Sequence, residues 1–156
     1  MLVKKIILSI LIVLVFCTLS ANHKSVLVIS NGVTTIYNSQ YRGNKLLTSI
    51  TIPDSVTIIG QYAFWGCSSL TSITIPDNVT AIREGTFMAC SSLTDVTIGS
   101  SVTKISYRAF TGCRSLTNIT IPDSVKVIDS NAFWGCVSLS EESRRRIREI
   151  NPEVWF

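Results

Sequence analysis

The chain has 156 residues, of which 46% are hydrophobic and 15% charged. This composition is typical of one globular domain and excludes a disordered chain. The formal charge is +4, and without Lys4 and Lys5, which lie in a segment predicted to be removed, it falls to +2. So small a charge gives no electrostatic reason to expect binding to nucleic acid or to a membrane surface.

Residues 1–20 have the pattern of a secretory signal peptide. Lys4 and Lys5 precede an apolar run over residues 6–19, and small residues begin at Ser20. This order of basic, apolar and small residues is typical of export signals. A membrane-spanning helix needs about 20 apolar residues, and this run is shorter. We therefore predict cleavage near residue 20.

The mature protein is then expected to be secreted or to lie outside the cytoplasm, at the cell surface or in the periplasm, without a membrane span. Lipid attachment at Cys17 is disfavoured, because Phe16 stands where lipoprotein signals usually carry a small residue.

From residue 21 to 139 the chain repeats with a period of 23 residues. Three residue types recur in phase: Leu47, Leu70, Leu93, Leu116 and Leu139; Phe64, Phe87, Phe110 and Phe133; Cys67, Cys90, Cys113 and Cys136. The period predicts five turns, near residues 24–46, 47–69, 70–92, 93–115 and 116–138. One turn buries too little apolar surface to fold alone, so stacking into a solenoid is expected.

Within a turn, the stretch "LTSITIP" alternates inward isoleucines with outward Ser49 and Thr51, which is the pattern of a short strand. Pro53 ends the strand at a corner. "VTIIG" predicts a second, shorter extended piece, and "YAFWGC" predicts a helical or 3₁₀ turn. Gly99 replaces the corner proline in the fourth turn, so we expect that corner to be looser.

One complete copy contains, in this order, Leu47, Ile50, Ile52-Pro-Asp, Val, Ile-Gly, Ala-Phe and Gly-Cys. This order resembles the 23-residue leucine-rich repeat of BspA-like surface proteins of bacteria and protozoa. The resemblance covers residues 24 to 139. It implies an α/β-type leucine-rich repeat solenoid of short parallel strands with turns and 3₁₀ segments. It also implies a binding or adhesion protein outside the cytoplasm, without one shared ligand.

The period stops at residue 139, and residues 140–156 predict a capping helix. Ser140 is placed to cap it, two glutamates suit its first turn, and Ile147 and Val154 fall on one face. Pro152 ends it. A short amphipathic helix would cover the apolar end of the last turn. The alternative, a basic docking patch of four arginines, is weakened by four glutamates in the same tail.

The in-phase cysteines lack the closely spaced pairs of zinc sites. Stacked turns hold equivalent residues about 5 Å apart with parallel side chains, whereas a disulfide needs Cβ atoms near 3.8 Å. We therefore predict buried free thiols. Asp54, Asp77 and Asp123 form a column that would suit calcium, but an aspartate after proline also suits a turn, in which it accepts the N–H two residues on. Ser100 interrupts the column, and we favour the turn.

No catalytic arrangement is visible, and we expect neither an enzyme nor a cofactor or metal. The one histidine, His23, lies beside the predicted cleavage site. No serine or cysteine has an evident base, and glycine-rich phosphate loops are absent.

Surface residues remain as the candidates for function. The candidate ligand-binding residues are Thr51, Thr74, Asp95, Thr97, Asn118, Thr120, Trp65 and Trp134. The first six are predicted to point outward from successive strands. The two tryptophans follow the buried phenylalanine and are expected near the outer surface, partly buried against a neighbouring turn.

We therefore predict an exported, non-catalytic binding or adhesion module that recognises a protein or a host or cell-surface glycan. The alternative is a self-assembling repeat scaffold, and a threonine array that contacts ice is more distant. Glycosylation at Asn78 ("NVT") and Asn118 ("NIT") depends on a eukaryotic host and stays open.

Overall fold

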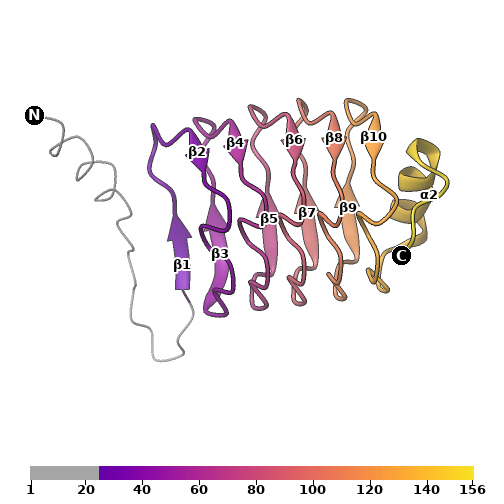
Figure 1. Ribbon diagram of the computed structural model, residues 1–156, viewed down its shortest axis with the longest axis horizontal. Helices are drawn as coiled ribbons and strands as arrows, with labels where there is room; N and C mark the ends of the chain where they lie inside the picture. The colour runs from indigo at the N-terminus through magenta and orange to yellow at the C-terminus, as the bar shows by residue number, and fades with distance from the viewer. Residues whose placement is uncertain (1–24) are drawn as a thin grey trace, which may run out of the picture.

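The computed structural model describes residues 25–156 as a single solenoid (Figure 1). Each turn contributes a first strand and a shorter second strand. The first strands are β1 (Ser25–Val28), β3 (Leu47–Thr51), β5 (Ser72–Thr74), β7 (Asp95–Thr97) and β9 (Asn118–Thr120). The second strands are β2 (Thr35–Ile36), β4 (Ile58–Ile59), β6 (Ala81–Ile82), β8 (Lys104–Ile105) and β10 (Val127–Ile128).

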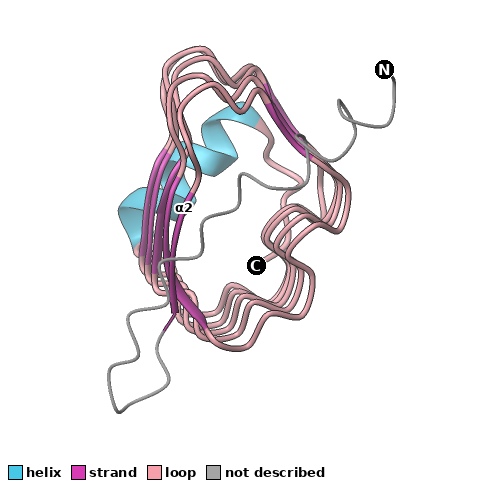
Figure 2. Ribbon diagram, turned by 90° about the vertical axis from the view of Figure 1, so that its left-hand side faces the viewer, coloured by secondary structure: helices cyan, strands magenta, loops and turns pink. Residues whose placement is uncertain are grey.

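All pairing between turns is parallel, and in β5, β7 and β9 it joins residues 23 apart, such as Ile73 with Val96. The first strands form a β1-β3 pair and a β5-β7-β9 sheet, and the second strands form β2-β4 and β6-β8-β10. The amide of Thr71 donates to the carbonyl of Thr48, so the first-strand column continues across the break in the ladder. Viewed along the axis, the turns follow nearly one path (Figure 2). The leucine-rich repeat solenoid is thus confirmed.

The core is a set of in-phase apolar columns that run the length of the solenoid. Leucine, valine, isoleucine, phenylalanine and cysteine positions are buried in every complete turn, as is the alanine position, which Thr86 occupies in the third. Phe64, Phe87, Phe110 and Phe133 are fully buried, and successive rings stack at 5.3–5.5 Å between centroids. Tyr41 extends the stack into the first turn at 5.4 Å. Stacking the turns therefore buries what one turn would expose.

The cysteines join each turn to the one before it. The thiol of Cys90 donates to the carbonyl oxygen of Phe64 at 3.2 Å, and the thiols of Cys67, Cys113 and Cys136 make the equivalent bond at 3.1 Å. All four are buried and free, as the repeat spacing predicts. Each of these carbonyls already accepts the amide three residues on, as that of Phe64 does from Cys67, so the thiol is its second donor and comes from the next turn.

The loop segment that follows each second strand is here called the arc (residues 37–46, 60–69, 83–92, 106–115 and 129–138). The arc uses a left-handed backbone at two in-phase positions. The first is occupied by Ser39, Tyr62, Gly85 and Arg108 (φ 56–59°). The second is filled by glycine in four turns (φ 71–78°) and by Ala89 (φ 59°) in the third. A residue with a β-carbon is strained in this conformation, whereas glycine is not.

The expectation that Gly99 loosens its corner is wrong. Gly99 is buried, and its carbonyl accepts from the amide of Val102 as that of Pro76 accepts from Val79. A β-carbon at Gly99 would collide with the backbone of Pro76 and Asp77. Glycine therefore allows a closer approach of two turns rather than a looser one.

Helix α2 (Glu141–Ile150) lies across the end of the solenoid beside β9 and β10, as predicted (Figure 1). Ser140 caps it by accepting from the amide of Ser143. The helix also closes both strand edges. The Ser143 hydroxyl accepts from the amide of Ile119, and the Asn151 side chain donates to the carbonyl of Ile128.

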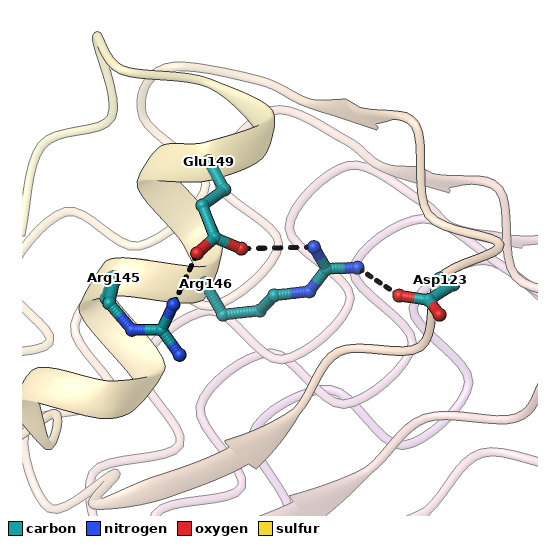
Figure 3. A network of polar contacts seen from close by, with 4 residues as sticks. All are labelled: Asp123, Arg145, Arg146 and Glu149. Atoms are coloured by element: carbon teal, nitrogen blue, oxygen red, sulfur yellow. Dashed lines mark hydrogen bonds and ion pairs between the residues drawn. The ribbon is translucent and has the colours of Figure 1, made fainter.

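The arginines of α2 are engaged within the cap. Arg146 bridges Asp123 at 2.7 Å and Glu149 at 3.2 Å, and Arg145 pairs with Glu149 at 2.6 Å (Figure 3). Arg144 donates to the carbonyls of the last turn. These contacts favour the capping role over a free basic patch.

Candidate binding surface

The strand face is the set of outward side chains on the first strands. It consists of two columns: Ser49, Ser72, Asp95 and Asn118; and Thr51, Thr74, Thr97 and Thr120. The alternation of the pleat produces it, because the residue between the two columns is buried in each strand, as with Ile73, Val96 and Ile119. Figure 2 shows the first strands gathered on one side of the solenoid.

The structure brings six predicted residues together on this face. Thr74, Thr97 and Thr120 are register neighbours on β5, β7 and β9, and Asp95 pairs in register with Asn118. All five are exposed, and Thr51 is exposed on β3. Neighbouring strands lie about 4.8 Å apart, so these side chains form a continuous polar patch.

The hydroxyls of the Thr74 column make no hydrogen bond within residues 25–156 and face outward, available to a ligand. The Asn118 amide donates to Asp95 at 3.5 Å, which is a long contact between exposed groups. The patch therefore offers donors and acceptors that a partner can satisfy without breaking strong internal bonds.

A neighbouring threonine column, missed by the sequence reading, stiffens this face. The hydroxyls of Thr71, Thr94 and Thr117 each donate to the carbonyl of the equivalent threonine one turn earlier, at 3.0–3.2 Å. Thr48 bonds Ser25 in the same way. The in-phase threonines were visible in the sequence, but their direction was not.

The strand side of the solenoid is acidic. The segments 47–55, 70–78, 93–101 and 116–124 contain four aspartates and neither lysine nor arginine. The aspartates are Asp54, Asp77, Asp95 and Asp123. Partners for this side are therefore expected to offer hydrogen-bond donors or positive charge.

The aspartate turn proposed from the sequence is wrong for Asp77. Its carboxylate accepts from the amide and hydroxyl of Ser100 in the next turn, at 2.6 and 3.0 Å, rather than from its own turn. These bonds lower the pKa of Asp77 below its usual 3.8. Asp123 is bound by Arg146 instead. The column thus links turns, and residues 25–156 contain no cluster of three or more potential metal ligands.

The two tryptophans lie in the arc after β4 and β10, apart from the strand face. Trp65 is half-buried under the guanidinium of Arg42, which lies 3.7 Å from the ring centroid. Trp134 is 61% exposed, more than the partial burial expected. The eight predicted residues therefore belong to two surfaces.

The buried thiols are poor nucleophiles. Burial raises the pKa of Cys67 to about 11 and raises those of Cys90 and Cys113 further. A thiol must ionise to act as a nucleophile, and these stay protonated at neutral pH. His23 lies outside the described residues.

The sequence matches the family described as "BspA type Leucine rich repeat region" over residues 16–140, in six copies. The chain belongs to this family. The family and its fold are typically non-catalytic. The match begins nine residues before β1, so part of its first copy lies outside the described residues.

Solved structures agree. A leucine-rich cell surface protein from Faecalibacterium prausnitzii is 35% identical, with a TM-score of 0.73, over 76% of this chain and 32% of that chain. A leucine-rich repeat protein from Eubacterium ventriosum is 29% identical, with a TM-score of 0.66, over 72% and 31%. The chain thus spans about a third of these proteins.

No curated protein matches the sequence. Within residues 25–156, no helix has the length and apolarity needed to cross a bilayer. The family supports a binding or scaffold module of the kind found in bacterial surface proteins.

Proposed function

We propose that this chain is an exported, non-catalytic binding module that recognises a macromolecule, either a protein or a surface glycan, through the strand face. One observation carries the proposal. Thr74, Asp95, Thr97, Asn118 and Thr120 form a contiguous exposed patch of hydrogen-bonding groups on a sheet that hydrogen bonds hold rigid.

Rigidity favours binding because the strand-face residues are already ordered by the sheet before a partner arrives. Their removal costs the fold little, since they cover no core. The charge of Asp95 and the amide of Asn118 also break the regularity of the threonine columns, which argues against the ice-contacting alternative. A macromolecule with spaced polar groups fits better.

The test begins with a pull-down from the native environment using the purified full chain. The captured partner is then titrated against a quadruple variant, Thr74→Ala, Asp95→Ala, Thr97→Ala and Asn118→Ala. Each lost hydrogen bond weakens binding by about 0.5–1.5 kcal/mol, so we expect at least a tenfold loss of affinity with nearly unchanged melting.

The matched control replaces four exposed polar residues away from the strand face. They are Thr34, Gln61, Thr80 and Ser138, each changed to alanine. Its affinity should stay within twofold of the parent. Full affinity of the strand-face variant would reject the strand face and transfer the proposal to the arc around Trp65 and Trp134.

Export is the second part of the proposal and rests on residues 1–20. Expression in a bacterial host should give protein outside the cytoplasm whose first residue, by N-terminal sequencing, lies near residue 21. An intact Met1 on exported or surface-bound protein would show that the segment is not a cleaved signal.

The second candidate function, a self-assembling scaffold, is favoured by the first turn. The strand face becomes apolar there, with Val26 45% and Val28 49% exposed on β1, and exposed apolar edge strands pair readily with other chains. Sedimentation of the full chain should then show oligomers that Val26→Ser with Val28→Thr abolishes. A monomer at high concentration would exclude this function.

A further inference from the structure

The arc carries the opposite charge to the strand side. Its five segments contain five basic residues and two acidic ones, Glu84 and Asp129. The basic residues are Arg42, Lys45, Arg83, Arg108 and Arg114. All five are exposed, and none forms an ion pair within residues 25–156, whereas Asp129 pairs with Lys104 at 3.5 Å. This side has a surplus of unpaired positive charge.

Part of the arc is organised into a continuous cluster across the first four turns, here called the arginine–aromatic cluster. The guanidinium of Arg42 lies 3.7 Å from the centroid of Trp65. Trp65 packs at a tilt against Tyr62, with centroids 6.0 Å apart. The Tyr62 hydroxyl donates to the carboxylate of Glu84 in the next turn. The contacts thus connect three turns.

The fourth turn completes the cluster. Arg108 lies over the ring of Tyr107, with 4.8 Å to the centroid. The pKa of Tyr62 is raised, chiefly by its hydrogen bond to Glu84, while the charge of Arg108 acts to lower it. The amide of Gly85, next to Glu84, donates to the carbonyl of Tyr107 at 3.0 Å, so the third and fourth turns lie side by side at this point. A glycine makes the arrangement possible, because a β-carbon at Gly85 would collide with the Tyr62 ring.

Two arginines are thereby held in place before any ligand arrives. A guanidinium that stacks on an aromatic ring keeps N–H groups free at its edge, and those groups match a carboxylate in a two-pronged geometry. Fixing the side chain in advance reduces the entropy lost on binding. Arg42 and Arg108 stand at the two ends of the cluster, and within residues 25–156 neither forms an ion pair with a carboxylate.

The chemistry between the arginines favours a sugar over an acidic peptide. Glu84 repels the carboxylates of either polymer equally, but its carboxylate can accept hydroxyl groups, which a sugar has and a polyglutamate side chain lacks. Tyr107, which is 38% exposed, offers aromatic surface to an apolar sugar face. The cluster thus offers guanidinium groups that bind anions, a carboxylate that accepts hydroxyl groups, and an aromatic surface. These groups together match a sugar polymer that carries carboxylates.

We propose that the arginine–aromatic cluster is a second binding site, separate from the strand face, for an acidic polysaccharide whose sugars carry carboxylate groups. The site goes beyond the proposed function, because it uses other residues, the opposite charge and another side of the solenoid. A protein with both sites would hold a macromolecular partner on one side and an acidic polymer on the other.

The test is a binding titration of the full chain with polygalacturonate, with poly-L-glutamate at equal carboxylate concentration and with neutral dextran. We expect polygalacturonate to bind, poly-L-glutamate to bind at least tenfold more weakly, and dextran not to bind. Arg42→Gln with Arg108→Gln should lower polygalacturonate affinity at least tenfold, since charge-assisted hydrogen bonds are among the stronger ones. Added salt should weaken binding.

The matched control is Lys126→Gln with Arg145→Gln, which removes two exposed positive charges outside the cluster. This control should change the affinity for polygalacturonate less than twofold. The strand-face quadruple variant should also change it less than twofold, and this result would separate the site from the proposed function. An equal loss in the control would show attraction by net charge alone and overturn the proposal. So would equal binding of poly-L-glutamate, which would identify an acidic peptide site, or no binding of polygalacturonate.

Discussion

Replacing Ala89 by glycine should stabilise the protein, although it removes a methyl group. Ala89 has φ 59° at the arc position where Gly43, Gly66, Gly112 and Gly135 have φ 71–78°. A left-handed backbone costs an L-residue about 1–2 kcal/mol, and glycine loses about 0.5–1 kcal/mol more than alanine in chain entropy on folding. The difference predicts a gain of up to about 1.5 kcal/mol.

The reverse change, Gly112→Ala, is the matched control. A β-carbon there would lie 3.7 Å from Cα of Ala89 and 3.9 Å from its nitrogen, which is ordinary contact, so the cost is conformational alone. It should destabilise the protein by a similar amount.

Thermal and urea unfolding of both variants measure the two effects. A change of 1 kcal/mol corresponds to about 2–6 °C in Tm for a domain of this size. A lower Tm for Ala89→Gly, or an unchanged one for Gly112→Ala, would show that this position does not require a left-handed backbone.

Three further predictions follow from the packing. Burial raises the pKa of Cys67 to about 11, so about one Cys67 thiol in a thousand is ionised at pH 8. Iodoacetamide should therefore label the cysteines of the native protein far more slowly than those of the unfolded protein. Rapid labelling of the native protein, or a disulfide found by mass spectrometry, would contradict the stacking of the turns. Removing residues 140–156 uncovers Leu139 and deprives the amide of Ile119 of its acceptor, the Ser143 hydroxyl. The truncated protein should therefore melt at a lower temperature or aggregate. A truncated monomer as stable as the parent would show that the tail is a docking segment instead. The lowered pKa of Asp77 contributes stability that is present above the unfolded value near 3.8 and is lost as pH falls through the folded value. Asp77→Asn should therefore reduce the drop in Tm between pH 5 and pH 2.5, and a drop as large as that of the parent would contradict the bonds to Ser100.

The period of 23 was enough to predict the solenoid, its core and its cap. Leu70, Phe87 and Cys90 recur in phase because every turn places them against the same neighbours, so repetition alone marks them as buried. The helix was also legible, because Ser140 followed by two glutamates is a local signal that does not depend on distant contacts.

Side-chain contacts between neighbouring turns could not be predicted from the sequence in the same way. Repetition shows that Asp77 and Ser100 occupy equivalent positions, but not that the carboxylate reaches across to the next turn. The prediction for the Gly99 corner was wrong for the same reason, because the close approach of Gly99 to Pro76 is a contact between two neighbouring turns. The stacking of Arg42 on Trp65 depends on the course of two side chains, which the period does not constrain.

Carboxylate footprinting of the captured complex tests the strand face most directly. Carbodiimide coupling labels exposed carboxylates, and mass spectrometry reads each site in the free and bound protein. Asp95 is exposed in the middle of the patch, and Glu141 and Glu142 are exposed on α2. We predict that the partner protects Asp95 and leaves both glutamates as reactive as before. Unchanged labelling of Asp95, with Glu84 protected instead, would contradict the account and place the partner on the arc.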